Sequence, residues 1–102
     1  MFSPADRSQL RSKLLQTAAL DPRISGTALT GSAAADREDP WSDIDLAFGI
    51  AEPLTLPAVL ADWTAQMYAD HRALHHLDVP SGPCLYRVFL LPGTLQVDLA
   101  FV

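Results

Sequence analysis

Cysteine is almost absent from this chain, and that scarcity excludes two ways of stabilising a small protein. Cys84 is the single cysteine among 102 residues. One cysteine cannot form an internal disulfide bond, and it is too few for a cysteine-based metal site. We expect Cys84 to be a small buried residue and not a reactive thiol, because Arg87 is the one basic residue near it in sequence.

Long apolar runs are absent as well. No stretch of the sequence reaches the uninterrupted apolar length of a membrane-spanning helix. The first residues, Met1 to Pro4, show neither the basic start nor the apolar stretch of a signal peptide. The expectation is a soluble cytoplasmic protein without a membrane partner.

Basic residues are few and scattered. Seven Lys and Arg residues stand against twelve Asp and Glu, which gives a formal net charge of -5. This balance speaks against broad binding to a phosphate backbone, so a nucleic-acid partner is not expected, and it mildly favours a cationic or metal-carried partner. Hydrophobic residues make up 49% of the chain, and this length suits one folded domain, which we place at residues 1–102.

Two segments have the spacing of amphipathic helices. The first begins with Ser3 as N-cap and Pro4 at the first helical position, and the pair Asp21-Pro22 ends it. The second is predicted over residues 56–74, where apolar residues recur at helical spacing. His71, His75 and His76 are predicted to lie near its end, with a capping or surface role favoured over metal binding.

Strands are predicted between and after these helices. A short strand over residues 23–31 ends at Gly31, and a second strand covers residues 43–50 after a polar loop. Two apolar runs within residues 84–102 are joined by Pro92-Gly93 and predict a β-hairpin. Strands separated by helices, followed by a hairpin, predict an α/β fold with a mixed sheet flanked by helices.

Two acidic residues interrupt the apolar pattern of the second strand. Asp43 and Asp45 point to the same face of a strand, and Ile44 points to the other face with the core. Their mutual repulsion would be costly without a counter-charge, and Mg²⁺ prefers such carboxylate oxygens together with phosphate and water. Asp98 has a similar apolar context on the last strand. If that strand lies beside the strand of Asp43, three carboxylates can hold two Mg²⁺ ions.

Gly31 and Ser32 follow the first strand at a turn. A glycine lets a phosphate approach the backbone, and the serine hydroxyl and the following amides can donate hydrogen bonds to it. Ser42 has two open interpretations, a donor to a phosphate or simply the start of the strand. Each signal alone also has a structural explanation: a solvated strand edge, an ordinary turn, or an inward-pointing charge that blocks aggregation.

Taken in order, these residues resemble the nucleotidyltransferase superfamily of the DNA polymerase beta type. Its pattern of Gly-Ser, a loop, two acids around an apolar residue and a later single acid is matched by Gly31, Ser32, Asp43, Asp45 and Asp98, within about residues 24–102. The resemblance implies that the three aspartates are the catalytic and metal-binding residues, with Asp98 helping to activate the acceptor hydroxyl. It also implies that Gly31 and Ser32 bind the nucleotide's phosphates, and that ATP or another NTP is the co-substrate.

Within that superfamily the sequence looks most like the antibiotic-modifying branch, which moves AMP from ATP onto a hydroxyl of an aminoglycoside or lincosamide. That resemblance implies that the chain is the N-terminal part of a longer protein. Two alternatives remain open: a minimal nucleotidyltransferase antitoxin that modifies or binds a partner toxin protein, and a non-catalytic nucleotide-binding or regulatory module.

Overall fold

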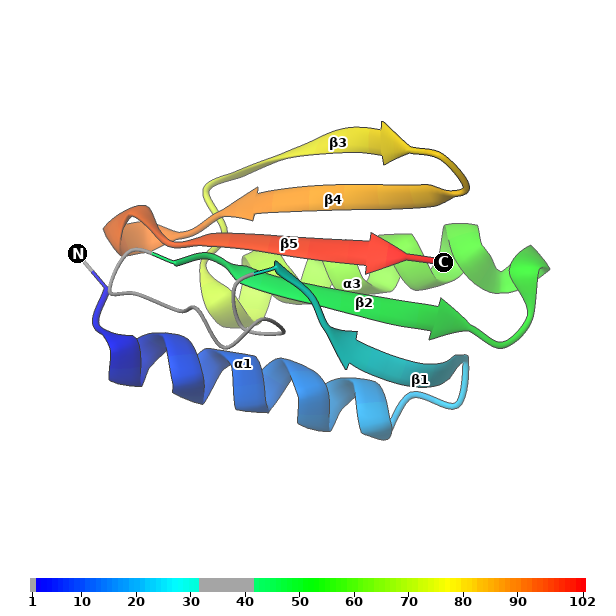
Figure 1. Ribbon diagram of the computed structural model, residues 1–102, viewed down its shortest axis with the longest axis horizontal. Coiled ribbons are helices and arrows are strands. Elements are labelled where there is room, and N and C mark those ends of the chain that lie inside the picture. The colour runs from blue at the N-terminus through cyan, green and yellow to red at the C-terminus, as the bar shows by residue number, and fades with distance from the viewer. Residues whose placement is uncertain (1, 32–41) are drawn as a thin grey trace.

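The computed structural model describes residues 2–31 and 42–102, which form a five-stranded sheet and its accompanying helices (Figure 1). In chain order the elements are α1 (Pro4–Ala19), β1 (Ile24–Leu29), β2 (Ile44–Ile50), the 3-10 turn η1 (Pro53–Thr55), α3 (Leu56–His71), β3 (His75–Ser81), β4 (Cys84–Leu90), the 3-10 turn η2 (Pro92–Thr94) and β5 (Gln96–Phe101). None of the helices in these two ranges is long and apolar enough to cross a membrane.

The sheet has the strand order β1-β2-β5-β4-β3. Strands β2 and β5 pair in parallel, and the other neighbours pair antiparallel. A parallel pair needs a long crossover, and here the chain between β2 and β5 contains α3 and the strands β3 and β4. The mixed sheet confirms the predicted fold class, and it places β5 directly beside β2.

The start of α1 follows the sequence prediction. Ser3 is the N-cap, its side chain accepts a hydrogen bond from the Asp6 amide, and the Asp6 carboxylate accepts one from the Ser3 amide. This capping box satisfies amides that the first helical turn leaves unpaired. Leu14 and Ala18 are buried against the sheet, as their spacing predicts.

The second predicted helix is too long, and a strand was missed after it. Helix α3 ends at His71 because Arg72 takes a left-handed conformation, with φ of 60°. The prediction that His75 and His76 lie near a helix end is wrong, because both residues belong to β3, which pairs antiparallel with β4. Leu74, the last residue of the predicted helix, lies between the two elements and is 69% exposed.

The predicted hairpin at the end of the chain is confirmed. Strands β4 and β5 pair antiparallel and are joined through the turn at Pro92-Gly93. Cys84 begins β4 and is half-buried, so it is less enclosed than expected. Its neighbour Arg87, whose direction the sequence left undecided, pairs with Asp78 and donates to Thr64 of α3, and it therefore faces the helices.

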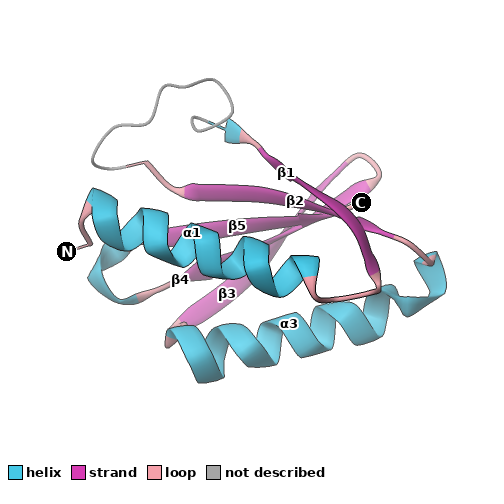
Figure 2. Ribbon diagram, turned by 90° about the horizontal axis from the view of Figure 1, so that it is seen from below, coloured by secondary structure: helices cyan, strands magenta, loops and turns pink. Residues whose placement is uncertain are grey.

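The hydrophobic core lies between one face of the sheet and the two long helices. Ile44, Leu46 and Phe48, alternate residues of β2, are fully buried there, in the same core as Leu14 of α1 and Trp63 of α3. The two helices run side by side along the sheet (Figure 2). The residues between the buried ones on β2 therefore point to the opposite face, which we call the acidic face because it carries Asp45 and Asp98.

Candidate functional site

Asp45 and Asp98 stand opposite each other on two adjacent strands. They are register partners in the parallel pair β2–β5. Their neighbours Ile44 and Val97 also pair and are fully buried in the core, so both aspartates point to the acidic face. Adjacent strands lie about 4.8 Å apart, which puts two half-buried carboxylates next to each other. The sequence prediction required the strand of Asp98 to lie beside that of Asp45, and the structure has this arrangement.

Asp43 lies close enough to Asp98 for their two charges to interact. It immediately precedes β2, two residues before Asp45, and is half-buried. Burial raises the pKa of the Asp43 carboxyl, and the negative charge of Asp98 raises it further. Burial and the charge of Asp98 therefore both disfavour the ionised form of Asp43 in the folded chain, and a bound cation would favour that form. Asp43, Asp45 and Asp98 are called the acid cluster below.

Gly31 lies against the Asp45 side chain. The Thr30 amide donates to the Asp45 carbonyl oxygen at 3.0 Å, which holds the end of the β1 segment beside β2. Gly31 has a φ of +64°, and a Cβ atom there would lie 2.8 Å from the Asp45 Cγ and closer still to its Oδ2. Only glycine fits this backbone next to this carboxylate. Ser32 and the predicted loop up to Trp41 lie outside the described residues.

Ser42 contacts a residue that sequence analysis did not single out. Its carbonyl oxygen accepts a hydrogen bond from Arg7 Nη1 at 3.2 Å. Arg7 lies on α1 and is only 5% exposed, and among the described residues it is the one charged side chain that is buried. The spacing gave a signal: Arg7 stands seven residues before Leu14, on the face of the helix that packs on the sheet. The two interpretations of Ser42, phosphate donor or strand start, both stay predictions.

Gln96 also contacts the acid cluster. Its Nε2 donates to Asp98 Oδ1 at 2.9 Å. The two residues are two apart on β5, so they share the acidic face. An amide donor fixes the orientation of the Asp98 carboxylate and disperses part of its charge. The signal in the sequence is the same period of two that relates Asp43 to Asp45.

The donor set of the acid cluster fits Mg²⁺. Residues 2–31 and 42–102 contain no group of three or more His, Cys, Asp or Glu side chains already arranged around one point as a metal cage. Mg²⁺ does not need such a cage, because it usually keeps several waters and is held by one or two carboxylates and by substrate phosphates. Half-buried carboxylates, two of them in register, supply oxygen ligands of that kind, and the metal ligands stay a prediction.

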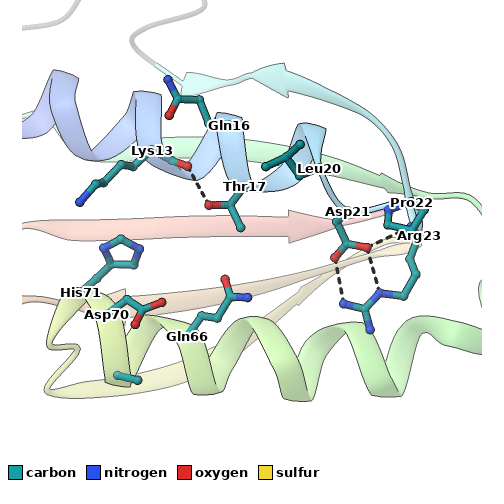
Figure 3. A pocket seen from close by; sticks show the side chains of 11 residues that line it. Lys13, Gln16, Thr17, Leu20, Asp21, Pro22, Arg23, Gln66, Asp70 and His71 are labelled. Atoms are coloured by element: carbon teal, nitrogen blue, oxygen red, sulfur yellow. Dashed lines mark hydrogen bonds and ion pairs between the residues drawn. The ribbon is translucent and has the colours of Figure 1, made fainter.

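A groove of about 1040 Å³ lies elsewhere, between α1 and α3 (Figure 3). It is lined by residues of α1 and α3 and of the segment between α1 and β1, on the core side of the sheet and away from the acidic face. Arg23 forms ion pairs there with Asp21 and with Asp62 of α3, at 2.9 and 2.7 Å. Hydrogen bonds from Arg23 lower the pKa of Asp21 to about 2, and Trp63 donates to the same carboxylate. These contacts tie the end of α1 to α3, so we assign them to stability.

Comparison with known proteins shows the fold. No protein-family model matches the chain, and no curated protein does. The polymerase core of TRAMP, an RNA surveillance complex, superposes with a TM-score of 0.62 over 100% of the chain at 18% identity. Cid1, which has RNA terminal uridylyl transferase activity, superposes with a TM-score of 0.62 over 97% of the chain at 13% identity.

The chain spans about a third of each of these structures, 33% and 31% of their lengths. The likeness agrees with the nucleotidyltransferase resemblance of the sequence, but it does not extend to the antibiotic-modifying branch. This chain has the nucleotidyltransferase fold.

Proposed function

We propose that this chain catalyses metal-dependent nucleotidyl transfer. The observation that carries the proposal is the register pairing of Asp45 with Asp98 on the acidic face, with Gly31 against the Asp45 carboxylate. The raised pKa of Asp43 supports it, because burial and the negative charge of Asp98 disfavour the ionised Asp43 carboxylate, and a bound cation would favour it. The fold likeness to a polymerase core and a uridylyl transferase supports the same reaction class.

The acid cluster would hold the metal, and the turn after β1 would hold the nucleotide. Asp43 and Asp45 would bind Mg²⁺, and Asp98 would complete the ligand set. When bound, Mg²⁺ supplies positive charge that stabilises the transferring phosphoryl group. Gly31 and Ser32 would bind the phosphates of the nucleotide through backbone amides and the hydroxyl.

Transfer would then proceed by displacement at the α-phosphorus. The acceptor hydroxyl oxygen forms the new bond to the α-phosphorus, and the bond from that phosphorus to the bridging oxygen breaks. Pyrophosphate leaves with the bond's electron pair. Asp98 accepts the proton of the acceptor hydroxyl, and Gln96, which donates to Asp98 Oδ1, orients that carboxylate.

For the substrates, we favour AMP transfer from ATP to a hydroxyl of a small acceptor such as an aminoglycoside or lincosamide. The charge distribution supports a small acceptor. Arg87 is the single Arg or Lys within the five strands, and it faces α3 and not the acidic face. A cytoplasmic location, where ATP and Mg²⁺ are available, belongs to this proposal.

A second candidate acceptor is the terminal hydroxyl of an RNA. It is favoured by one observation, that both of the structures named above belong to proteins that act on RNA. The absence of basic residues from the described strands on the acidic face argues against it, because RNA binding relies on neutralising phosphates.

The test begins with binding of a non-hydrolysable ATP analogue, measured by calorimetry with and without Mg²⁺. We expect binding that requires Mg²⁺ and is lost in Asp45→Asn. Asp70→Asn is the matched control, because Asp70 is an exposed aspartate of α3, on the other side of the sheet. Equal binding by Asp45→Asn and the wild-type chain would refute the assignment of the acid cluster.

The acceptor is tested next, with labelled ATP and either aminoglycosides, lincosamides or a short RNA. Label on an antibiotic supports the small acceptor, and label at the RNA terminus supports the second candidate. Binding of the nucleotide without transfer to any of these acceptors would contradict both acceptor assignments and favour the toxin-partner or regulatory alternative.

A further inference from the structure

Asp43 differs from the other two members of the acid cluster in how its backbone is held. Asp45 and Asp98 lie within the β2–β5 ladder, which begins at the pair Ile44 and Val97. Asp43 precedes that ladder, so pairing with β5 does not fix its backbone. A carboxylate that must keep one position relative to Asp98 needs another restraint there.

Arg7 provides a restraint at this point. Its Nη1 donates to the carbonyl oxygen of Ser42, the residue directly before Asp43, across 35 positions of the sequence. The Arg7 side chain is almost fully buried, and Arg7 itself lies in the first turns of α1. A charged hydrogen bond in a buried setting is stronger than a neutral one, and a buried guanidinium has little freedom to move.

The same end of α1 also reaches the strand that carries Asp98. The amide of Phe2, just before the helix, donates to the carbonyl oxygen of Gly93 at 3.1 Å. Gly93 lies in the turn that leads into β5. Because β2 and β5 are adjacent and parallel, their first residues lie at the same end of the sheet. The N-terminal end of α1 contacts the segment before each of these two strands.

The capping box makes this end of α1 a defined support. Ser3 and Asp6 satisfy each other's amides, and the Arg7 amide donates to the Ser3 carbonyl oxygen at 3.0 Å. The capping box therefore defines where the helix starts, and the backbone that carries the Arg7 side chain is held by hydrogen bonds.

We propose that Arg7 is a positioning residue of the acid cluster: by holding the Ser42 carbonyl, it fixes the backbone of Asp43 relative to Asp98 and so sets the affinity for Mg²⁺. The inference rests on the proposed function for its link to metal binding. Its structural half, that Arg7 orders the segment before β2, does not depend on any ligand.

The test uses Arg7→Met, which keeps a long side chain but removes the donors and the charge, and Arg7→Lys, which keeps the charge and a donor. Lys13→Met is the matched control, because Lys13 is an exposed basic residue of the same helix. Two quantities are measured in each variant: backbone order parameters from ¹⁵N relaxation without metal, and the Mg²⁺ concentration that gives half-maximal binding of the ATP analogue.

We expect Arg7→Met to lower the order parameters of Ser42 and Asp43 while Phe48, in the middle of β2, keeps its value. The Mg²⁺ concentration for half-maximal binding should rise about tenfold, which corresponds to about 1.4 kcal/mol. Arg7→Lys should recover only about half of both effects, because its ammonium group has a shorter reach and a different donor geometry, and Lys13→Met should match the wild-type chain.

Unchanged order at Ser42 and Asp43 in a folded Arg7→Met chain would overturn the inference. So would a general loss of stability with an unchanged Mg²⁺ requirement, because that result describes a purely structural residue. If Arg7→Met does not fold, Arg7→Lys provides the test. The lysine side chain has a shorter reach and a different donor geometry. Order parameters at Ser42 and Asp43 and an Mg²⁺ requirement that both equal the wild-type values would therefore refute positioning by the guanidinium.

Failure of the proposed function gives a different result. In that case the wild-type chain shows no Mg²⁺-dependent binding at all. The order parameters of Arg7→Met and Lys13→Met then still decide whether Arg7 holds the segment before β2.

Discussion

Substituting Gly31 with alanine tests directly whether the turn after β1 lies against the acid cluster. Gly31 has a φ of +64°, where an alanine costs about 1–2 kcal/mol relative to glycine. In addition, the new Cβ would lie 2.8 Å from Asp45 Cγ, closer than real Cβ contacts. Asp45 has a short side chain on a paired strand, so it can relieve the contact only by rotating its carboxylate or by moving the turn.

Gly82 offers a matched control within the same chain. It has nearly the same φ, +59°, and a Cβ built on it meets nothing within 4 Å. Gly82→Ala therefore carries the backbone cost of about 1–2 kcal/mol without the contact. The difference between the two variants isolates the effect of crowding the Asp45 carboxylate.

The assay pairs urea denaturation with Mg²⁺-dependent binding of the ATP analogue. Both variants should lose about 1–2 kcal/mol of unfolding free energy, with Gly31→Ala at or beyond the upper end. Binding should weaken at least tenfold in Gly31→Ala and stay at the wild-type value in Gly82→Ala, because only the former displaces the Asp45 carboxylate. Equal binding by the two variants would refute the proposed role of the contact between Gly31 and Asp45 in binding the nucleotide.

Three further outcomes are expected. Asp43→Asn should raise the free energy of unfolding measured without metal at pH 7, and it should abolish Mg²⁺-dependent binding. The stability rises because the raised pKa of Asp43 means that its charged form is disfavoured in the folded chain. Urea titration checks the change in stability. Asp21→Asn should lose up to about 2 kcal/mol at neutral pH, because Arg23 lowers the pKa of Asp21 from 3.8 to about 2. That stabilisation is present above pH 3.8 and is lost as pH falls toward 2, so the two unfolding curves should converge there. Arg87→Gln, which breaks the ion pair with Asp78, should cost about 1 kcal/mol and leave nucleotide binding unchanged, measured by the same two assays.

The parts of the fold that the sequence predicted have strong local signals. Ser3 and Pro4 mark the start of α1, and Pro92-Gly93 marks the hairpin turn. The alternation of apolar residues with Asp43 and Asp45 predicted which face of β2 is buried. The place of β5 beside β2 came from the resemblance in motif order, since no local pattern specifies a parallel partner 53 positions along the chain.

The parts that were missed depend on contacts between distant segments. Strand β3 begins four residues after α3, and Leu74 extends the helical spacing past the true end of the helix. What ends the helix is the left-handed conformation of Arg72, a residue that carries no obvious stop signal. Arg7 has a charged side chain on an apolar face, and its partner at Ser42 is visible only in the folded chain.

The hydrophobic pattern that stabilises β2 is also what positions the acid cluster. Ile44, Leu46 and Phe48 are fully buried, and a shift of the strand by one residue would turn all three out of the core. The core therefore fixes the register of β2 against β5, and that register places Asp45 opposite Asp98. Carboxylates on the acidic face can repel one another without unfolding the chain, because the buried face supplies the stability. Selection for chemistry on one face and for packing on the other can then act on neighbouring residues almost independently.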